Sequence, residues 1–155
     1  MVTLVILRHA KSAWPDGVAD LDRPLGPRGL RDAPVAGQWL NENVPGLDLA
    51  VVSPALRARQ TWENAAAQLT IPPTVTEDSR IYYGPQLEVV QEMSEDVETA
   101  VIVGHNPALE MLTEYLTGRE TVFKTSTIAV LRSDHPWSTA GERWAELIDH
   151  TTPRG

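Results

Sequence analysis

The stretch Val2-Thr3-Leu4-Val5-Ile6-Leu7-Arg8-His9-Ala10-Lys11-Ser12 decides the fold of this chain. Residues 2–7 form an apolar, β-branched run of the right length for one buried strand. Ionisable side chains follow at once, so they should lie at the carboxyl end of that strand. Ligands bind at this end of the strands in open α/β sheets. We therefore interpret His9 as a candidate nucleophile and Arg8 as the group that holds the anion it attacks.

Length and composition narrow the class of protein. The 155 residues suit one domain, 1–155, with a single core. The formal net charge of −8 argues against a nucleic-acid partner, because such proteins present a basic face. No apolar stretch is long enough to span a membrane, so we expect no membrane partner and a cytoplasmic location. The absence of cysteine excludes disulfides and thiol catalysis, and the composition does not predict an oligomeric state.

Strands and helices should alternate along most of the chain. Runs of apolar and β-branched residues predict strands, and apolar residues at helical spacing predict the helices between them. After the first strand we expect strands at 47–52, 74–77, 99–103, 127–132 and 143–148, and helices at 27–43, 53–69, 84–93 and 106–118. This order predicts an α/β three-layer sandwich, in which helices flank a mostly parallel central sheet with a possible antiparallel edge.

Proline residues mark three of the predicted helices. Pro34 lies inside the first long helix, whose buried stripe should begin at Leu30, and should kink or split it. Ser53 and Asn106 are favoured helix N-caps, and each precedes a proline that is pre-set for the first helical position. Arg57 then falls in the first turn of its helix, off the buried stripe.

Three of the strands end in polar groups that should meet at one edge of the sheet. Arg8 and His9 end the first strand, His105 follows a later one, and Arg57 opens the helix after a third. A helix N-terminus favours anions, and the guanidinium fork of arginine matches the oxygens of a phosphate. The sequence therefore predicts a phosphate site at this edge.

Two histidines beside a phosphate could bind a metal or carry out phosphoryl transfer. Arginines would repel a cation, and no acidic or cysteine partner recurs at ligand spacing, so we expect no metal and no cofactor. In phosphoryl transfer a neutral imidazole attacks phosphorus and forms a phosphohistidine, which water later removes. The second histidine and the arginines would stabilise charge on the equatorial oxygens.

Four motifs resemble the histidine phosphatase superfamily, which has the fold of the phosphoglycerate mutases. Two of them, Arg8-His9-Ala10-Lys11 and Asp22-Arg23-Pro24-Leu25 with Arg28-Gly29, resemble SixA-type phosphohistidine phosphatases in particular. The others are Ser53-Pro54-Ala55-Leu56-Arg57-Ala58-Arg59-Gln60-Thr61 and Val103-Gly104-His105-Asn106-Pro107. The resemblance implies a phosphatase whose nucleophile is His9 and whose phosphate pocket is formed by Arg8, Arg57 and His105.

The chain departs from the family where many members carry a general-acid glutamate. Residues 80–84 read Arg-Ile-Tyr-Tyr-Gly there, and Asp20, Asp22 and Glu77 are the carboxylates that could swing in instead. An alkoxide leaving group needs a proton, whereas a phosphohistidine departs as neutral imidazole. We therefore expect a phosphohistidine protein as substrate; the alternatives are a small phosphate-ester phosphatase and a non-catalytic phospho-ligand binding module.

The remaining predictions concern the openness of the site and the residues that contact the substrate. The segments 10–25 and 78–86 are short, which leaves the site open and suits a phosphate carried by a protein. Trp14 could line the mouth of the pocket, but cover of the core is expected. The expected substrate-binding residues are Lys11, Ser12, Gly104 and Asn106, of which the first two could also only solvate their loop. No convergent context surrounds His135 or His150.

Overall fold

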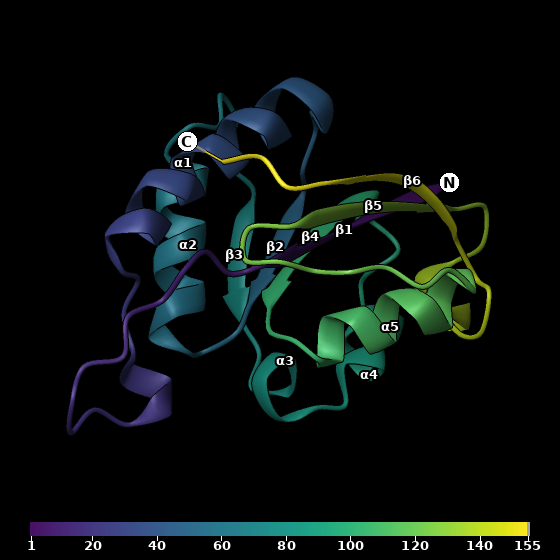
Figure 1. The fold of residues 1–155 in the computed structure, drawn as a ribbon. Helices are drawn as coiled ribbons and strands as arrows, with labels where there is room; N and C mark the ends of the chain where they lie inside the picture. Colours follow the sequence, from purple (N-terminus) through teal and green to yellow (C-terminus); the bar gives the residue numbers. More distant parts are fainter. Residues whose placement is uncertain (155) are drawn as a thin grey trace.

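The computed structural model describes residues 1–154, and its six strands form one mixed sheet. The sheet order is β3-β2-β4-β1-β5-β6 (Figure 1). Strands β1 to β4 pair in parallel, whereas β5 runs antiparallel to β1 and β6 antiparallel to β5. The strands are β1 (Val2–Arg8), β2 (Leu49–Val52), β3 (Thr74–Glu77), β4 (Thr99–Gly104), β5 (Ile128–Ser133) and β6 (Glu146–Thr151). The predicted parallel sheet with an antiparallel edge is confirmed.

Helices cover both faces of the sheet (Figure 1). Along β1, Val5 and Leu7 pack into the core beneath α1 and α2, while Leu4 and Ile6 pack on the opposite face with α4 and α5. No helix within residues 1–154 is long and apolar enough to cross a membrane. The helices are α1 (Pro27–Asn43), α2 (Leu56–Ala66), α3 (Arg80–Tyr83), α4 (Gln86–Gln91) and α5 (Ala108–Thr117).

The N-cap predictions for α2 and α5 are wrong, because both polar side chains have other partners. Helix α2 begins at Leu56, and the hydroxyl of Ser53 lies 2.7 Å from Nε2 of His105. Helix α5 begins at Ala108, and the Asn106 amide donates to the carbonyl oxygen of Phe123 at 2.7 Å. The two side chains therefore organise the strand ends rather than the helices.

The predicted split of α1 at Pro34 is also wrong. The helix runs unbroken from Pro27 to Asn43, although proline removes one backbone donor from it. Its buried face, with Ala33, Ala36 and Leu40 at 0% exposure, supplies the packing that offsets this loss. Leu30, expected on that face, is instead 51% exposed.

Gly37 of α1 lies against the backbone of Ala65 in α2, and this contact predicts the effect of a substitution on stability. A Cβ atom at this position would overlap the carbonyl oxygen of Ala65. Overpacking of this kind costs about 1–3 kcal/mol, so we expect Gly37→Ala to lower the free energy of unfolding by that amount. Urea denaturation measures the change, with Arg31→Ala, at an exposed position of the same helix, as the control. Equal stability of Gly37→Ala and wild type would contradict this packing.

Candidate active site

The carboxyl ends of β1, β2 and β4 meet at one edge of the sheet around a cavity of about 220 Å³. The cavity is rich in cationic side chains, and no carboxylate of the described residues lines it. Its walls bring together the four predicted catalytic residues and three of the four predicted substrate-binding residues. The lining residues are Arg8, His9, Lys11, Ser12, Trp14, Arg23, Arg57, His105, Asn106 and Thr125.

Gly104, the fourth predicted substrate-binding residue, lies beside the cavity and not in its wall. Its carbonyl oxygen accepts the backbone N–H of His9 at 3.1 Å. A Cβ atom on Gly104 would lie 2.9 Å from Cγ2 of Ile81. The missing side chain therefore makes room for Ile81 of α3 and does not bring the backbone against a ligand.

His9 is held as a neutral imidazole with one nitrogen free. Its Nδ1 lies 2.7 Å from the carbonyl oxygen of Ala10. Because a carbonyl oxygen can only accept, Nδ1 carries the hydrogen and Nε2 keeps its lone pair. Burial lowers the pKa of His9 to about 3, and the charges of His105, Arg57 and Arg8 act in the same direction, against the Ala10 hydrogen bond. The side chain is thus in the form that a nucleophile requires.

His105 faces His9 across the cavity, with ring centres 5.1 Å apart. Its Nε2 lies 2.7 Å from Oγ of Ser53, which also accepts the backbone N–H of Ala55 at 3.2 Å. The Ser53 hydroxyl can then donate to Nε2, which leaves the hydrogen of His105 on Nδ1. Burial, followed by the charge of Arg57, lowers the pKa of His105 to about 4.

Two buried nitrogen atoms of the site have no hydrogen-bond partner within residues 1–154. They are Nε of Arg8 and Nδ1 of His105. An unsatisfied buried donor costs about 1–3 kcal/mol, so both donors favour an anion that could accept from them. A third unpartnered atom, Oδ1 of Asn106, is an acceptor and does not suit an anion.

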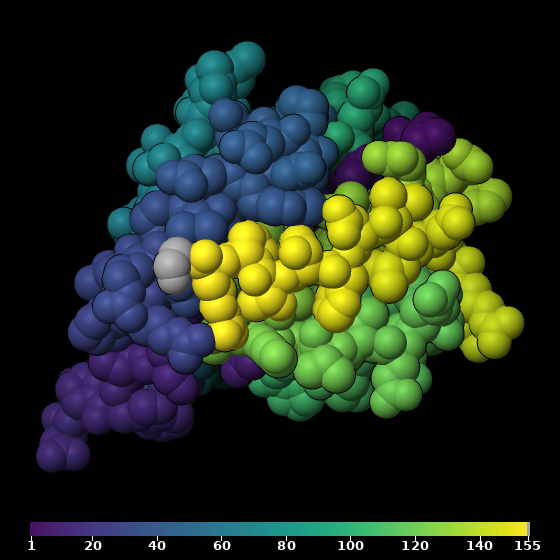
Figure 2. All heavy atoms as spheres, turned by 45° about the horizontal axis from the view of Figure 1, so that its top comes forward, coloured from purple at the N-terminus to yellow at the C-terminus, as the bar shows by residue number. Residues whose placement is uncertain are grey.

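Arg57 lies in the first turn of α2, as predicted, where it is buried against the cavity and held by Asp20. Its two terminal nitrogens donate to the carbonyl oxygen of Asp20 at 2.7 Å and to the carboxylate at 3.0 Å. The same carboxylate accepts from Arg23 at 3.0 Å and from the hydroxyl of Tyr82 at 2.5 Å. Asp20 therefore fastens the segment between β1 and α1, which projects at one end of the molecule (Figure 2), to α2 and α3.

None of the three carboxylates proposed as a general acid occupies the cavity. The hydrogen bond from Tyr82, together with those from Arg23 and Arg57, holds the pKa of Asp20 well below its usual range. Asp20 is therefore ionised and has no proton to give. Glu77 pairs with Arg59 at 3.6 Å, and Asp22 is exposed. The described residues thus place no acidic donor beside a leaving group.

Trp14 lines the cavity mouth, and the expectation that it covers the core is wrong. The side chain is 74% exposed, and the guanidinium carbon of Arg23 lies 3.2 Å from the centre of its ring. Arg23 also donates to the hydroxyl of Ser12 at 2.5 Å. The stacked pair forms one side of the entrance to the cavity.

Comparison with known proteins assigns the chain to a family. The model of the histidine phosphatase superfamily (branch 1) matches residues 4–81. The chain belongs to this superfamily. As a histidine phosphatase it is a hydrolase, and its similarities point to the SixA type. It is 30% identical over 138 residues to the phosphohistidine phosphatase SixA of Escherichia coli, with 83% of this chain and 84% of SixA covered.

Other relatives of this histidine phosphatase are similar to it over nearly its whole length. An uncharacterized protein of Mycobacterium tuberculosis is 38% identical over 162 residues, covering 96% of this chain and 100% of that protein. A SixA structure from Nakamurella multipartitia superposes with a TM-score of 0.83 at 32% identity, covering 98% of this chain and 96% of that one. The structure of SixA complexed with tungstate has the same fold, with a TM-score of 0.83 at 24% identity over 98% of this chain and 97% of that one.

The low pKa of His9 gives this phosphatase a measurable signature. The ordinary value is 6.5 and the value in the site is about 3, so His9 should stay neutral as the pH falls from 8 to 5. We expect the NMR shift of its Cε1 proton to remain constant over this range and to move only towards pH 3. A titration midpoint near 6 would contradict the burial and charge described here. Comparison with His9→Gln assigns the signal.

Several residues of the site are not among the catalytic and substrate-binding residues predicted from the sequence. Arg23 lies in the motif Asp22-Arg23-Pro24-Leu25, whose resemblance to SixA-type phosphatases could have pointed to Arg23 as a site residue. Thr125 carries no local signal, because the antiparallel turn of the chain before β5 brings it to the cavity. In the sequence, Tyr82 stands out only because residues 80–84 lack the glutamate found in many members of the family. Its role as a donor to Asp20 depends on the position of α3 and has no local signal.

Proposed function

We propose that this histidine phosphatase removes phosphoryl groups from phosphohistidine in proteins through a phosphorylated His9. The observation that carries the proposal is a neutral His9 in a cationic cavity whose described walls hold no carboxylate. In this proposal His9 is the nucleophile and the cationic side chains bind the anion, while none of the described carboxylates is beside the cavity to protonate an alkoxide. Arg8, His9, Arg57 and His105 would form the catalytic set, with Lys11, Ser12 and Asn106 in contact with substrate.

In the first step, Nε2 of His9 attacks phosphorus and the phosphorus–nitrogen bond of the substrate breaks. The bonding electron pair goes to the departing nitrogen, and the substrate imidazole leaves neutral because its other nitrogen holds a hydrogen. The free donors of Arg8 and His105, with Arg57, stabilise the charge on the equatorial oxygens. No proton transfer to the leaving group is needed.

In the second step, water attacks the phosphorus of phospho-His9. The new phosphorus–oxygen bond forms as the bond to Nε2 breaks, and the electron pair returns to His9. Inorganic phosphate leaves, and the protons of the water pass to phosphate and solvent. The Ala10 carbonyl oxygen keeps the hydrogen on Nδ1 throughout, so His9 also departs as a neutral group.

Two further observations support a protein substrate. One relative, at 30% identity, is the phosphohistidine phosphatase SixA of Escherichia coli. The cavity of about 220 Å³ is smaller than the roughly 300–1,000 Å³ of typical small-molecule sites. It accommodates a phosphoryl group, and most of the substrate then lies outside it.

Leaving-group dependence tests this function. We expect kcat/KM for a phosphohistidine peptide to exceed that for the matching phosphoserine peptide by about a hundredfold or more, because general acid catalysis is worth about 10²–10⁴-fold. Both reactions should be unchanged by EDTA, since no step uses a metal. Equal rates on the two peptides would favour the small-ester phosphatase instead. Binding of phosphate without turnover of either peptide would favour the non-catalytic binding module.

A further inference from the structure

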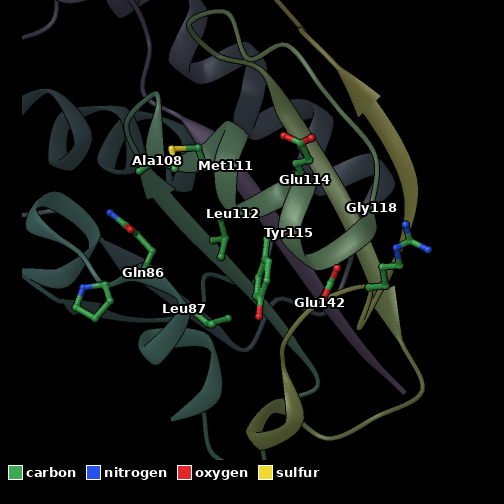
Figure 3. A pocket seen from close by; sticks show the side chains of 11 residues that line it. Gln86, Leu87, Ala108, Met111, Leu112, Glu114, Tyr115, Gly118 and Glu142 are labelled. Carbon is green, nitrogen blue, oxygen red and sulfur yellow. The ribbon is translucent and has the colours of Figure 1, made fainter.

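A second and larger hollow, of about 700 Å³, runs along helix α5 on the side of the sheet that α3 and α4 cover. Figure 3 shows Leu112 and Tyr115 pointing from α5 into this groove, with Gln86 and Leu87 on its opposite wall. The groove spans the length of α5, and the ten residues of that helix extend about 15 Å.

The walls of the groove expose apolar side chains to solvent. Met111 is 66% exposed and Tyr115 is 46% exposed, and these two residues lie one helical turn apart. Leu87, which is half-buried, adds to this apolar surface, and Leu112 lines the groove as a nearly buried side chain at 6% exposure. Single exposed apolar residues are ordinary, but a hollow lined by several of them is typical of an interaction site.

The groove begins next to the phosphate cavity. One end is formed by Pro85 and Ala108. Ala108 follows His105 by three residues, and Pro85 follows Tyr82 by three, while the rings of His105 and Tyr82 are only 5.4 Å apart. A substrate whose phosphoryl group lies in the cavity therefore has this groove as the adjoining apolar surface.

The far end of the groove carries unbalanced negative charge. Glu114 and Glu142 line it, and neither forms an ion pair within residues 1–154. Arg143 lies at the same end, where its side chain approaches Gly118, so one carboxylate remains in excess. A partner that fits this end carries a lysine or an arginine.

We propose that the groove binds a segment of the phosphoprotein substrate that combines apolar residues with a basic one. This inference rests on the function proposed above and names the feature of the substrate that the enzyme recognises. The apolar part of the segment covers Met111 and Tyr115, and its basic residue reaches Glu114 and Glu142. Since the groove is about 15 Å long, the segment lies within about five extended residues of the phosphohistidine.

Paired peptides test this proposal. Both carry the same phosphohistidine, but one has leucine and lysine within five positions on either side, and the other has serine and glutamate there. We expect wild type to prefer the first peptide by about tenfold in kcat/KM, mainly through KM, because two apolar side chains become buried. In the double variant Met111→Ser, Tyr115→Ser the preference should fall to about twofold or less. Hydrolysis of a small aryl phosphate should be unchanged.

Ile71→Ser is the matched control, because Ile71 is 80% exposed and lies outside the groove. It should keep the full preference. Glu114→Gln with Glu142→Gln should weaken the preference only for peptides that carry lysine. The proposal is overturned if wild type does not distinguish the two peptides, or if the preference survives in the Met111→Ser, Tyr115→Ser variant. A wild-type dimer that this double variant converts to a monomer would also overturn it, since a second copy would then occupy the groove.

Phosphotyrosine versions of the two peptides distinguish a failure of groove binding from a failure of the proposed phosphohistidine phosphatase function. A tyrosine phosphate needs less help from a general acid than an alkyl phosphate, so these peptides report docking without depending on phosphohistidine chemistry. If phosphohistidine is not preferred over phosphoserine but the phosphotyrosine pair is still distinguished, the proposed function fails and the groove stands. If phosphohistidine is preferred but neither pair is distinguished, only the groove fails.

Discussion

His9→Ala should lower kcat/KM on a phosphohistidine peptide by about 10⁴-fold or more, the scale seen when a covalent nucleophile is removed. The structure gives His9 no substitute, because the other imidazole of the cavity, His105, is fixed by Ser53 at 2.7 Å through Nε2. Steady-state kinetics on the purified variant measures the loss. The main effect should be on kcat, because the arginines that bind the phosphate remain in place.

His135→Ala is the control for this experiment, since His135 is exposed and far from the cavity in sequence and structure. It should retain activity within about twofold, as expected for an exposed surface position. Circular dichroism and urea denaturation should show that both variants are folded. A His9→Ala protein that keeps a tenth or more of wild-type activity would show that another residue attacks the phosphorus.

Arg57→Ala should lower kcat/KM by about 10–150-fold, because a hydrogen bond to a charged group is worth roughly 1.5–3 kcal/mol. Two effects combine in this loss. The phosphoryl group loses a guanidinium, and the carboxylate of Asp20 loses the donor that holds it at 3.0 Å. Among residues 1–154, the Asp20 carboxylate then keeps Arg23 and Tyr82 as its side-chain partners.

Arg59→Ala provides a matched control on the same helix. The Arg59 side chain is 43% exposed and pairs with Glu77 at 3.6 Å, so its loss should change kcat/KM by about twofold or less. Arg57→Lys should fall between wild type and alanine, because lysine keeps the charge but loses the planar fork. Equal activity of Arg57→Ala and Arg59→Ala would mean that Arg57 does not contact the transferred phosphoryl group.

The core of the site could be predicted from sequence because parallel strands bring their carboxyl ends to one edge. Arg8 and His9 end β1, His105 follows β4, and Arg57 follows β2 after a short connection. Strands β2, β4 and β1 are direct neighbours in the sheet. Three strand ends with polar residues were therefore enough to predict the convergence that the structure shows.

The partners of these residues could not be predicted, because they depend on how segments far apart in sequence fold against each other. Asp20 meets Arg57 across 37 positions and Tyr82 across 62. Ser53 and Asn106 have the local pattern of N-caps, but tertiary contacts take their side chains elsewhere. Local capping propensity is worth only about 1 kcal/mol, which one buried hydrogen bond can outweigh.

The phosphorylated intermediate is the most direct test of the mechanism. Enzyme mixed with a radiolabelled phosphohistidine peptide should be quenched within one turnover, and the labelled residue identified by proteolysis and mass spectrometry. We expect the phosphate on His9, stable in base and lost in acid, and no labelling of His9→Ala. Phosphate on any other residue would contradict attack by His9. So would a wild-type enzyme that turns over the peptide, shows a burst of released substrate peptide in the first turnover, and yet carries no phosphate when quenched.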